Sequence, residues 1–211
     1  MKLYYFPGAC SLADHIVLEW IGAQYETVQM DHSSIKSPDY LTLNANGTVP
    51  LLMDGDLLLD QNAAILCHLT DLYPQAHLIG DNTPRGRAEV MRWLSYLNSD
   101  VHPAFKPIFS PTRFLPDEAF SGMIADTARN NVRGHLRHLD ARLEGRDWLV
   151  EQRSIADPYL FVMLRWAVRL GIGLEAFKNL SRFLQRMYAD PGVHAAILAE
   201  EGAVADSSIR S

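Results

Sequence analysis

The chain has little of what marks several classes of protein. Its 211 residues include two cysteines, Cys10 and Cys67, so no framework of disulfide bonds supports the fold. The formal net charge of −6 argues against a general affinity for nucleic acid or anionic lipid. The longest apolar run, residues 159–164, is too short to cross a bilayer, and the first residues lack the apolar core of a signal peptide. We therefore expect a cytoplasmic protein that binds neither nucleic acid nor membrane.

Strand-like and helix-like stretches alternate in the first part of the chain. Residues 2–6 and 25–30 read as strands. Between them, Ser11 and Asp14 have the spacing of a capping box, which predicts a helix that begins there and ends at Gly22. A polar loop follows the second strand.

A hairpin and another helix complete this half. The turn sequence Asp54-Gly55-Asp56 separates the strand-like residues 49–53 and 57–59. Asp60 is positioned to cap a helix that stops before Pro74. The order strand–helix–strand, then strand–strand–helix, predicts a mixed sheet with helices packed on it. This is the thioredoxin-like arrangement, and we assign it to residues 1–80.

Strand signals disappear after a turn-rich linker at residues 80–84, so the second half is predicted to be an all-α domain at residues 85–202. Ser154 and Asp157 form a second capping box before an apolar, buried helix. Residues 203–211 are expected to be a flexible tail. The expected helices lie at residues 85–101, 119–143, 157–170 and 174–188.

Cys10 is the first candidate for chemistry. It lies between a strand and the first turn of a helix, one residue before Ser11. The partial positive charge at a helix N-terminus stabilises a thiolate and lowers the pKa of the thiol. The pattern therefore allows a nucleophile, or a former of mixed disulfides, at Cys10. The alternative is a small buried residue at a tight turn.

Two other local features are ambiguous. A cis Val49–Pro50 bond would leave the Val49 backbone free for a peptide-like ligand, whereas a trans bond would mark an edge strand. The helix that opens with Asp60, Gln61 and Asn62 offers free backbone N–H groups to a carboxylate, or it is only a capped helix.

Together these features resemble the glutathione transferase family, and within it the bacterial beta class. The resemblance begins with Met1-Lys2-Leu3-Tyr4-Tyr5 and continues to about Gly202. It rests on Pro7-Gly8-Ala9-Cys10-Ser11-Leu12, Val49-Pro50, Gln61-Asn62-Ala63-Ala64-Ile65-Leu66, Trp93-Leu94-Ser95-Tyr96, His102, Ser154-Ile155-Ala156-Asp157 and Leu164-Arg165-Trp166-Ala167. It implies a thioredoxin-like N-terminal domain and a helical-bundle C-terminal domain.

The resemblance also implies a glutathione site. Cys10 would lie beside the glutathione sulfur, and His102 would approach the thiol from the second domain. Imidazole can donate to a thiolate or accept its proton near neutral pH, but a helix-end histidine is the alternative. The other implied contacts are Val49 before a cis Pro50 for the cysteinyl part, Gln61 and Asn62 for the γ-glutamyl end, and Lys36 for the glycyl carboxylate.

Three residues depart from the pattern of the beta class. Gln61 and Asn62 stand where an acidic residue and a serine are usual, and Pro103 stands where a lysine is often seen. Gln61 still offers hydrogen bonds but adds no charge attraction for the ammonium group of glutathione. Asn62 can donate through its amide, although its longer side chain is able to shift the ligand.

A pocket for the second substrate is expected between the halves. Its candidate lining residues, next to His102, are Phe105, Phe109 and Trp166, of which at least one is expected to belong to the core. His135 and His138 are spaced to share a helix face, but no further ligand cluster accompanies them, so no metal is expected.

The function implied is that of a cytoplasmic, homodimeric glutathione S-transferase involved in detoxification, with glutathione as co-substrate. It would transfer glutathione to a small apolar electrophile, or reduce disulfides through a mixed disulfide at Cys10. The alternative is a non-enzymatic binding protein with the same fold and a drifted glutathione site.

Overall fold

The structure is a computed structural model that describes residues 1–209, with side chains up to residue 202. The chain divides into two compact units. One comprises Gly80–Arg186, and the other joins Met1–Ile79 to the chain from Met187 onward. The described chain from Met187 onward therefore belongs to the N-terminal unit, whereas the sequence analysis assigns it to the helical domain up to residue 202. The tail expected at residues 203–211 overlaps the last helix, and its final two residues lie outside the described residues.

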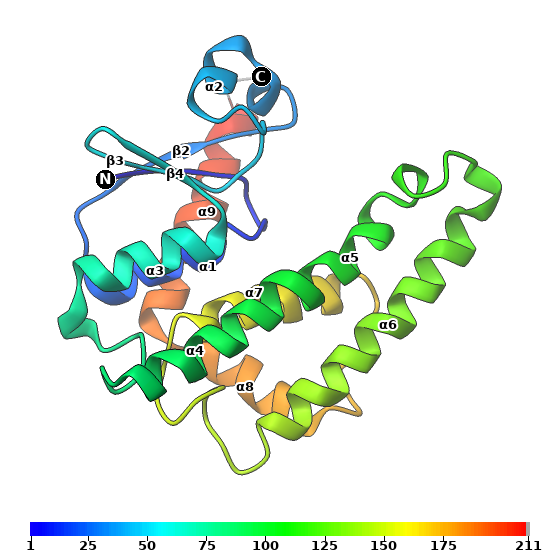
Figure 1. The fold of residues 1–211 in the computed structure, drawn as a ribbon. Helices are drawn as coiled ribbons and strands as arrows, with labels where there is room; N and C mark the ends of the chain where they lie inside the picture. Colours follow the sequence, from blue (N-terminus) through cyan, green and yellow to red (C-terminus); the bar gives the residue numbers. More distant parts are fainter. Residues whose placement is uncertain (210–211) are drawn as a thin grey trace. The chain divides into compact units, whose positions relative to one another are not determined.

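The N-terminal unit is built on a mixed sheet of four strands (Figure 1). The strands are β1 (Lys2–Tyr5), β2 (Glu26–Gln29), β3 (Leu51–Asp54) and β4 (Leu57–Asp60). Their order is β2-β1-β3-β4, with β1 parallel to β2 and antiparallel to β3, and β3 antiparallel to β4. The predicted thioredoxin-like arrangement of strands is confirmed.

Within residues 1–209, four α-helices accompany the sheet, and α1 and α3 run side by side along one face of it (Figure 1). They are α1 (Leu12–Ile21), α2 (Pro38–Leu43), α3 (Asn62–Leu72) and α9 (Pro191–Ile209). The sequence analysis missed α2, because six residues carry too little periodicity to stand out from a polar loop. It also missed α9, which packs against α1 although its apolar residues form no single stripe.

Alternation along the strands gives the sheet two buried faces. Leu3 and Leu52 pair across β1 and β3 and are fully buried, and the Tyr5 ring lies 5.9 Å from the ring of His15 in α1. On the other face, Leu51 packs with Tyr40 of α2. The helices on both faces therefore hold β1 and β3 at the centre of the unit.

The helical unit contains one long interrupted helix and several others. Its first helix, expected to end at residue 101, continues to Phe109 through a π-helical turn. Pro103 stands in the first turn after this interruption, where its missing N–H costs little. The elements are α4 (Pro84–Tyr96), η3 (Leu97–Val101), α5 (His102–Phe109), α6 (Ser121–Arg142), α7 (Ala156–Arg169) and α8 (Lys178–Ala189), which continues into the N-terminal unit.

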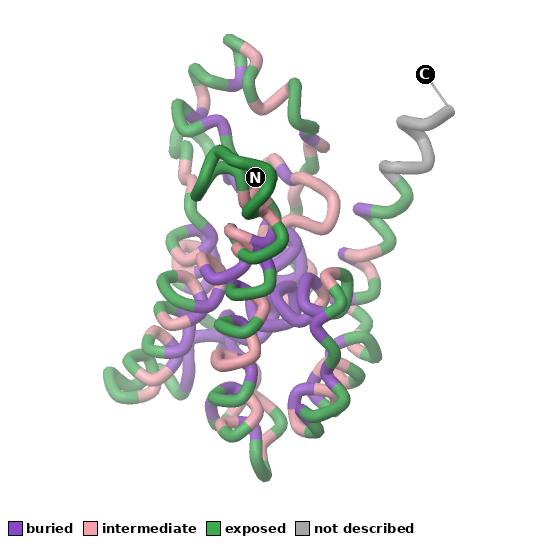
Figure 2. The backbone as a smooth tube through the Cα atoms, turned by 90° about the vertical axis from the view of Figure 1, so that its right-hand side faces the viewer, coloured by how far each residue is buried: buried purple, intermediate pink, exposed green. Residues whose placement is uncertain are grey.

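Helix α7 is the buried helix that the sequence predicts. Every residue from Tyr159 to Leu164 is buried, whereas Val168 is exposed. Most other helices carry buried residues along one stripe only, and Figure 2 shows this alternation along their turns. None of the helices within residues 1–209 has the length and apolar character needed to span a bilayer.

Of the predicted helix caps, only Ser154–Asp157 is present. The Asp157 carboxylate accepts hydrogen bonds from the backbone N–H groups of Ser154 (2.7 Å) and Leu149 (2.9 Å). Ser11 and Gly22 flank α1 as predicted, but Ser11 makes no side-chain capping bond, and the predicted cap at Asp60 was wrong because Gln61 holds that position. The Ser11 hydroxyl bonds back to Phe6 instead, and Asp60 ends β4 and accepts from an asparagine side chain.

Candidate active site

Cys10 lies in the turn between β1 and α1, close to the segment that precedes β3. Its Sγ is 3.8 Å from the carbonyl oxygen of Val49, to which the thiol donates. The Val49–Pro50 peptide bond is cis, so the cis alternative of the sequence analysis holds. The structure thus brings Cys10 and the predicted backbone contact, Val49, together.

The electrostatic expectation for Cys10 was wrong. Burial, followed by the nearby Asp14 carboxylate, raises the pKa of the Cys10 thiol to about 12. The backbone N–H groups of Cys10 and Ser11 lower that pKa but do not offset the increase, and Glu200 raises it further. The stabilising effect of a helix N-terminus on a thiolate is outweighed here by burial and by two acidic side chains.

The chain leading to Val49 is braced by two side chains. The Tyr40 hydroxyl and the Asn44 side-chain amide both donate to the carbonyl oxygen of Thr48, at 2.7 Å and 2.8 Å. Asn44 is buried and also accepts from the backbone N–H of Asn46 (3.0 Å). These bonds fix the backbone that carries the Val49 carbonyl beside Cys10.

Lys36 lies in a 3-10 turn, η1 (Ser34–Lys36), and contacts the same loop. Its Nζ donates to the carbonyl oxygen of Gly47 at 3.0 Å. Gly47 has a φ of +56°, and a Cβ there would lie 2.7 Å from the carbonyl oxygen of Ile35 and 2.9 Å from Lys36 Nζ. The positive φ and the close approach of the Ile35 carbonyl therefore require glycine at this position.

Gln61 and Asn62 stand at the start of α3, where they were expected to hold the γ-glutamyl end. Gln61 adopts a left-handed φ of 72°. Asn62 is buried, and its Nδ2 donates to the carbonyl oxygen of Cys10 (2.8 Å) and to Asp14 Oδ2 (2.9 Å). Both amide hydrogens of Asn62 are used within the protein, so what this residue offers a ligand is its backbone N–H.

In the helical unit, His102 opens α5 and lies among aromatic rings. The ring centroid of Trp166 in α7 is 4.9 Å from that of His102, 5.6 Å from that of Phe105 and 5.4 Å from that of Phe109. Phe105 is fully buried and Trp166 nearly so, whereas Phe109 is 41% exposed. Phe105 is therefore a core residue, and Phe109 is the member of the cluster that reaches solvent.

The ring of His102 is oriented by a second aromatic residue. Its Nδ1 is 2.7 Å from the Tyr159 hydroxyl, which donates to Asn98 Oδ1 at 3.1 Å. With the hydroxyl hydrogen directed to Asn98, the assigned tautomer places the proton of His102 on Nδ1 and a lone pair on Nε2. Burial, with a smaller contribution from Lys106, lowers the pKa of His102 to about 4, so the imidazole is neutral at pH 7.

The sequence analysis missed several residues of these surroundings. Asp14, which the sequence analysis assigned only to a helix cap, is an acidic residue inside an apolar helix, which is a readable signal, and burial raises its pKa well above the usual value. Lys106, one turn after His102, acts on its pKa although Pro103 removes the usual lysine. Glu200 accepts from the backbone N–H of Gly8 at 2.9 Å. A separation of 192 residues leaves no local signal for that contact.

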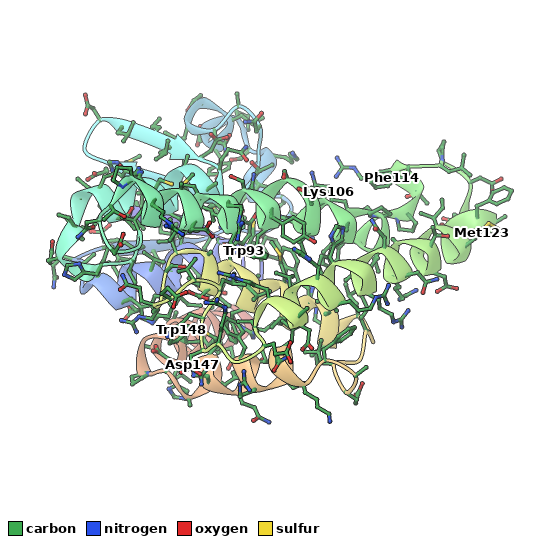
Figure 3. The ribbon with its side chains drawn as sticks, turned by 60° about the horizontal axis from the view of Figure 1, so that its bottom comes forward. Trp93, Lys106, Phe114, Met123, Asp147 and Trp148 are labelled. Atoms are coloured by element: carbon green, nitrogen blue, oxygen red, sulfur yellow. The ribbon has the colours of Figure 1, made fainter. Side chains whose placement is uncertain are left out.

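A cavity of about 710 Å³ lies between α5 and α6. Its lining includes Pro103, Pro107, Phe114 and Met123. Figure 3 shows Phe114 and Met123 at the connection between the two helices, far from Trp93. None of the three aromatic residues predicted to form the second-substrate pocket lines this cavity, so it is a separate feature of the helical unit. Within the part of the chain that the structure describes, no group of three or more His, Cys, Asp or Glu residues is placed to hold a metal ion.

Comparison with known proteins decides the family. The model of the glutathione S-transferase N-terminal domain matches residues 1–71, and that of the C-terminal domain matches residues 101–191. Glutathione S-transferase GST-4.5 of Xanthomonas campestris pv. campestris is 48% identical over 95% of this chain and 98% of its own length. The chain belongs to the glutathione S-transferase family.

Solved structures agree. A sphingomonad glutathione S-transferase in complex with glutathione is similar with a TM-score of 0.86, at 37% identity over 95% of this chain and 99% of the other. A bacterial beta class glutathione S-transferase from Sphingomonas chungbukensis has a TM-score of 0.83, at 37% identity over 95% of this chain and 98% of the other. The expected family and fold are thereby confirmed.

Proposed function

We propose that this protein is a glutathione transferase that binds reduced glutathione in its N-terminal unit and transfers it to a small apolar electrophile. The observation that carries the proposal is the meeting of three features in one unit: the Cys10 thiol, the Val49 carbonyl and the first turn of α3. The braced Val49 backbone suits the peptide-like cysteinyl part of glutathione. The α3 N-terminus suits the γ-glutamyl carboxylate, and Lys36 suits the glycyl carboxylate.

The raised pKa of Cys10 defines its role in conjugation. A thiol that stays protonated at neutral pH is a hydrogen-bond donor, and it stabilises the thiolate of bound glutathione by donating to it. His102 is neutral and carries a lone pair on Nε2, and the resemblance to the family supports it as the general base that accepts the glutathione proton. The thiolate then attacks the electrophile, and the leaving group departs with its electron pair.

A second reaction uses Cys10 covalently. The Cys10 thiolate attacks the disulfide bond of a mixed glutathione disulfide, forms a new disulfide with the glutathione sulfur and releases the other thiol. A second glutathione then attacks this disulfide, which restores Cys10 and yields glutathione disulfide. Cys10 must lose its proton before it attacks the disulfide. This route therefore requires a higher pH than conjugation.

Binding without turnover is the second candidate function, and one observation favours it. Asn62 donates its side-chain amide hydrogens to the Cys10 carbonyl and to Asp14. Gln61 carries no charge. The γ-glutamyl group of glutathione therefore has fewer side-chain contacts available than the family pattern provides. Such a protein would carry apolar ligands on the same fold. It would bind them without consuming glutathione.

The test is glutathione consumption with an activated aryl halide as the electrophile. We expect saturable turnover with glutathione and at least tenfold less with 2-mercaptoethanol at equal thiolate concentration, because the simple thiol lacks both carboxylates. Equal catalysed rates with the two thiols would contradict specific binding of glutathione, and no rate above the protein-free control would leave the non-enzymatic function.

We also propose that the protein is a cytoplasmic homodimer that serves detoxification. The resemblance to the family supports this assembly, in which the N-terminal domain of one chain meets the helical domain of the other. The mass of one chain is 23.7 kDa. Sedimentation at micromolar concentration should give a particle of twice that mass. A monomer alone would contradict it.

A further inference from the structure

A second cavity of the helical unit lies at the end of α6 and the first turns of α4. It has a volume of about 480 Å³, and all of its lining residues belong to Gly80–Arg186. One wall is the linker at Gly80, whose carbonyl oxygen accepts from the Gln152 side chain at 2.8 Å. The proposed reactions use none of the lining residues. A cavity of this volume is in the range that binds small molecules.

Arg142, the last residue of α6, lines this cavity and is held in place by two contacts. Its Nε donates to the carbonyl oxygen of Leu149 at 2.7 Å, and its guanidinium carbon lies 5.1 Å from the ring centroid of Trp93 in α4. Neither contact uses the terminal nitrogens Nη1 and Nη2, which have no hydrogen-bond acceptor among the described residues. This partly buried guanidinium is therefore preorganised and has unused donors for a ligand.

The acidic residues nearest to Arg142 are engaged by other arginines. Glu89 pairs with Arg92 at 2.9 Å, and Glu151 pairs with Arg146 at 2.7 Å. No carboxylate of the described residues forms an ion pair with Arg142. Burial, followed by Arg146 and Arg92, lowers the pKa of Arg142, and the two glutamates offset this only in part. The surroundings of Arg142 therefore favour the binding of an anion.

A second cation of the lining is likewise unpaired. Arg85 is exposed in the first turn of α4 and forms no ion pair among the described residues. The acidic residue nearest to it in the sequence, Asp81, is directed to Thr83 and accepts from its backbone N–H at 3.0 Å and from its hydroxyl at 2.6 Å. Two arginines of the lining, Arg85 and Arg142, are thus available to one ligand.

We propose that this cavity binds a small organic anion, whose phosphate or carboxylate group accepts two hydrogen bonds from Nη1 and Nη2 of Arg142 while Arg85 adds a second positive charge. The guanidinium fork matches the paired oxygens of these groups. The buried side chain of Val150 also lines the cavity and provides an apolar contact for the body of the ligand. Because the proposed glutathione site lies in the N-terminal unit, this site goes beyond the proposed function.

The test is a calorimetric titration of phenylphosphonate, and separately of benzoate, into the parent protein without glutathione. The two probes share an aromatic ring and differ in the anionic group, so the tighter probe identifies the group that the cavity prefers. At least one of them should bind saturably, one per chain, with a dissociation constant below about 1 mM. Benzyl alcohol has the same ring without a charge and should not bind.

Three variants locate the bound probe, and their melting temperatures show whether each is folded. Arg142→Met removes the charge, keeps an apolar side chain beside Trp93 and should weaken binding at least about tenfold. Arg85→Gln changes an exposed residue without a hydrogen bond in the protein and should weaken binding about threefold, so it decides the question even if Arg142→Met does not fold. Arg113→Gln makes the same charge change in η4 (Pro111–Arg113) and should leave binding unchanged.

A parent protein that binds neither probe with a dissociation constant below about 10 mM would overturn the inference. Equal weakening in Arg113→Gln would do the same, because it would reflect net charge alone. Lys36→Gln is the control for the proposed glutathione site. Binding that this variant weakens, and that Arg85→Gln and Arg142→Met leave intact, would place the probes in the N-terminal unit and overturn the inference as well. Since no titration contains glutathione, a failure of the proposed function would not change these results.

Discussion

The two units place their reactive side chains in opposite surroundings. Cys10 lies beside buried acidic groups, Asp14 and Glu200, whereas His102 lies among the rings of Trp166 and Tyr159. The effect on protonation is nevertheless the same. Burial raises the pKa of the thiol and lowers the pKa of the imidazole, so both groups are neutral at pH 7. In the proposed mechanism, the chemistry therefore depends on a proton that glutathione brings and not on a charge held in the ligand-free protein.

The largest effect is expected at Cys10. Cys10→Ala should reduce the disulfide reductase activity at least about 1,000-fold, which is roughly 4 kcal/mol of activation free energy, because no other group takes its covalent role. Conjugation loses only one hydrogen bond to the thiolate and should fall about tenfold. Stopped-flow and steady-state assays on one preparation measure both. Reductase activity that survives would rule out the covalent route.

The next effect is on the stability of the helical unit. Asp157→Ala should lower the free energy of unfolding by about 3 kcal/mol, because two buried backbone N–H groups lose their acceptor. Urea unfolding measures the change. Asp126→Ala, at an exposed position of α6, is the control and should cost less than about 0.5 kcal/mol. An equal decrease in the free energy of unfolding in the two variants would show that the Ser154–Asp157 capping box contributes no more to stability than an exposed aspartate.

The lowered pKa of His102 predicts that the stability of the fold depends on pH. Its pKa is about 4 in the folded protein and about 6.5 in an unfolded chain. Between these values the unfolded state binds more protons, so stability falls as pH drops from 6.5 to 4. His102→Gln should remove about 2 kcal/mol of this loss, as measured by urea unfolding at the two pH values. A pH dependence unchanged in the variant would contradict a partly buried imidazole with a lowered pKa.

The smallest effect concerns the orientation of His102. Tyr159→Phe removes the hydroxyl that bonds the imidazole Nδ1 and should cost about 1 kcal/mol of stability. The rate of conjugation at saturating glutathione should fall, with little change in the KM for glutathione, since Tyr159 acts through His102. A change in KM alone would assign Tyr159 to binding instead.

Local patterns were enough to predict much of the fold. Alternation and the Asp54-Gly55-Asp56 turn predict the strands, and the apolar sequence of α7 predicts a buried helix. Patterns over short windows fail where long-range contacts decide: α9 is held by α1, and Glu200 reaches Gly8 across most of the chain. The sequence also predicted that α1 begins after Ser11 but not that the Ser11 hydroxyl hydrogen-bonds Phe6 and makes no capping bond.

For the candidate site, the sequence predicted which residues lie together but not how their surroundings shift their pKa values. Cys10, Val49 and Asn62 lie together in the structure, and their contacts with glutathione stay predictions. The direction of the Cys10 pKa shift was not predictable, because a helix N-terminus is visible in the sequence whereas the burial of Asp14 beside it is not. Asn62 likewise looked like a ligand contact, and only its partner, Asp14, shows that its amide is occupied.

The most direct test of the central claim is a calorimetric titration of reduced glutathione into the fully reduced protein. Saturable binding of one glutathione per chain, with a dissociation constant below about 1 mM, is the predicted result, and binding of this kind raises the melting temperature. Gln61→Ala should weaken it while leaving the fold intact. No heat and no change in melting temperature at millimolar glutathione would contradict the claim that this site binds glutathione.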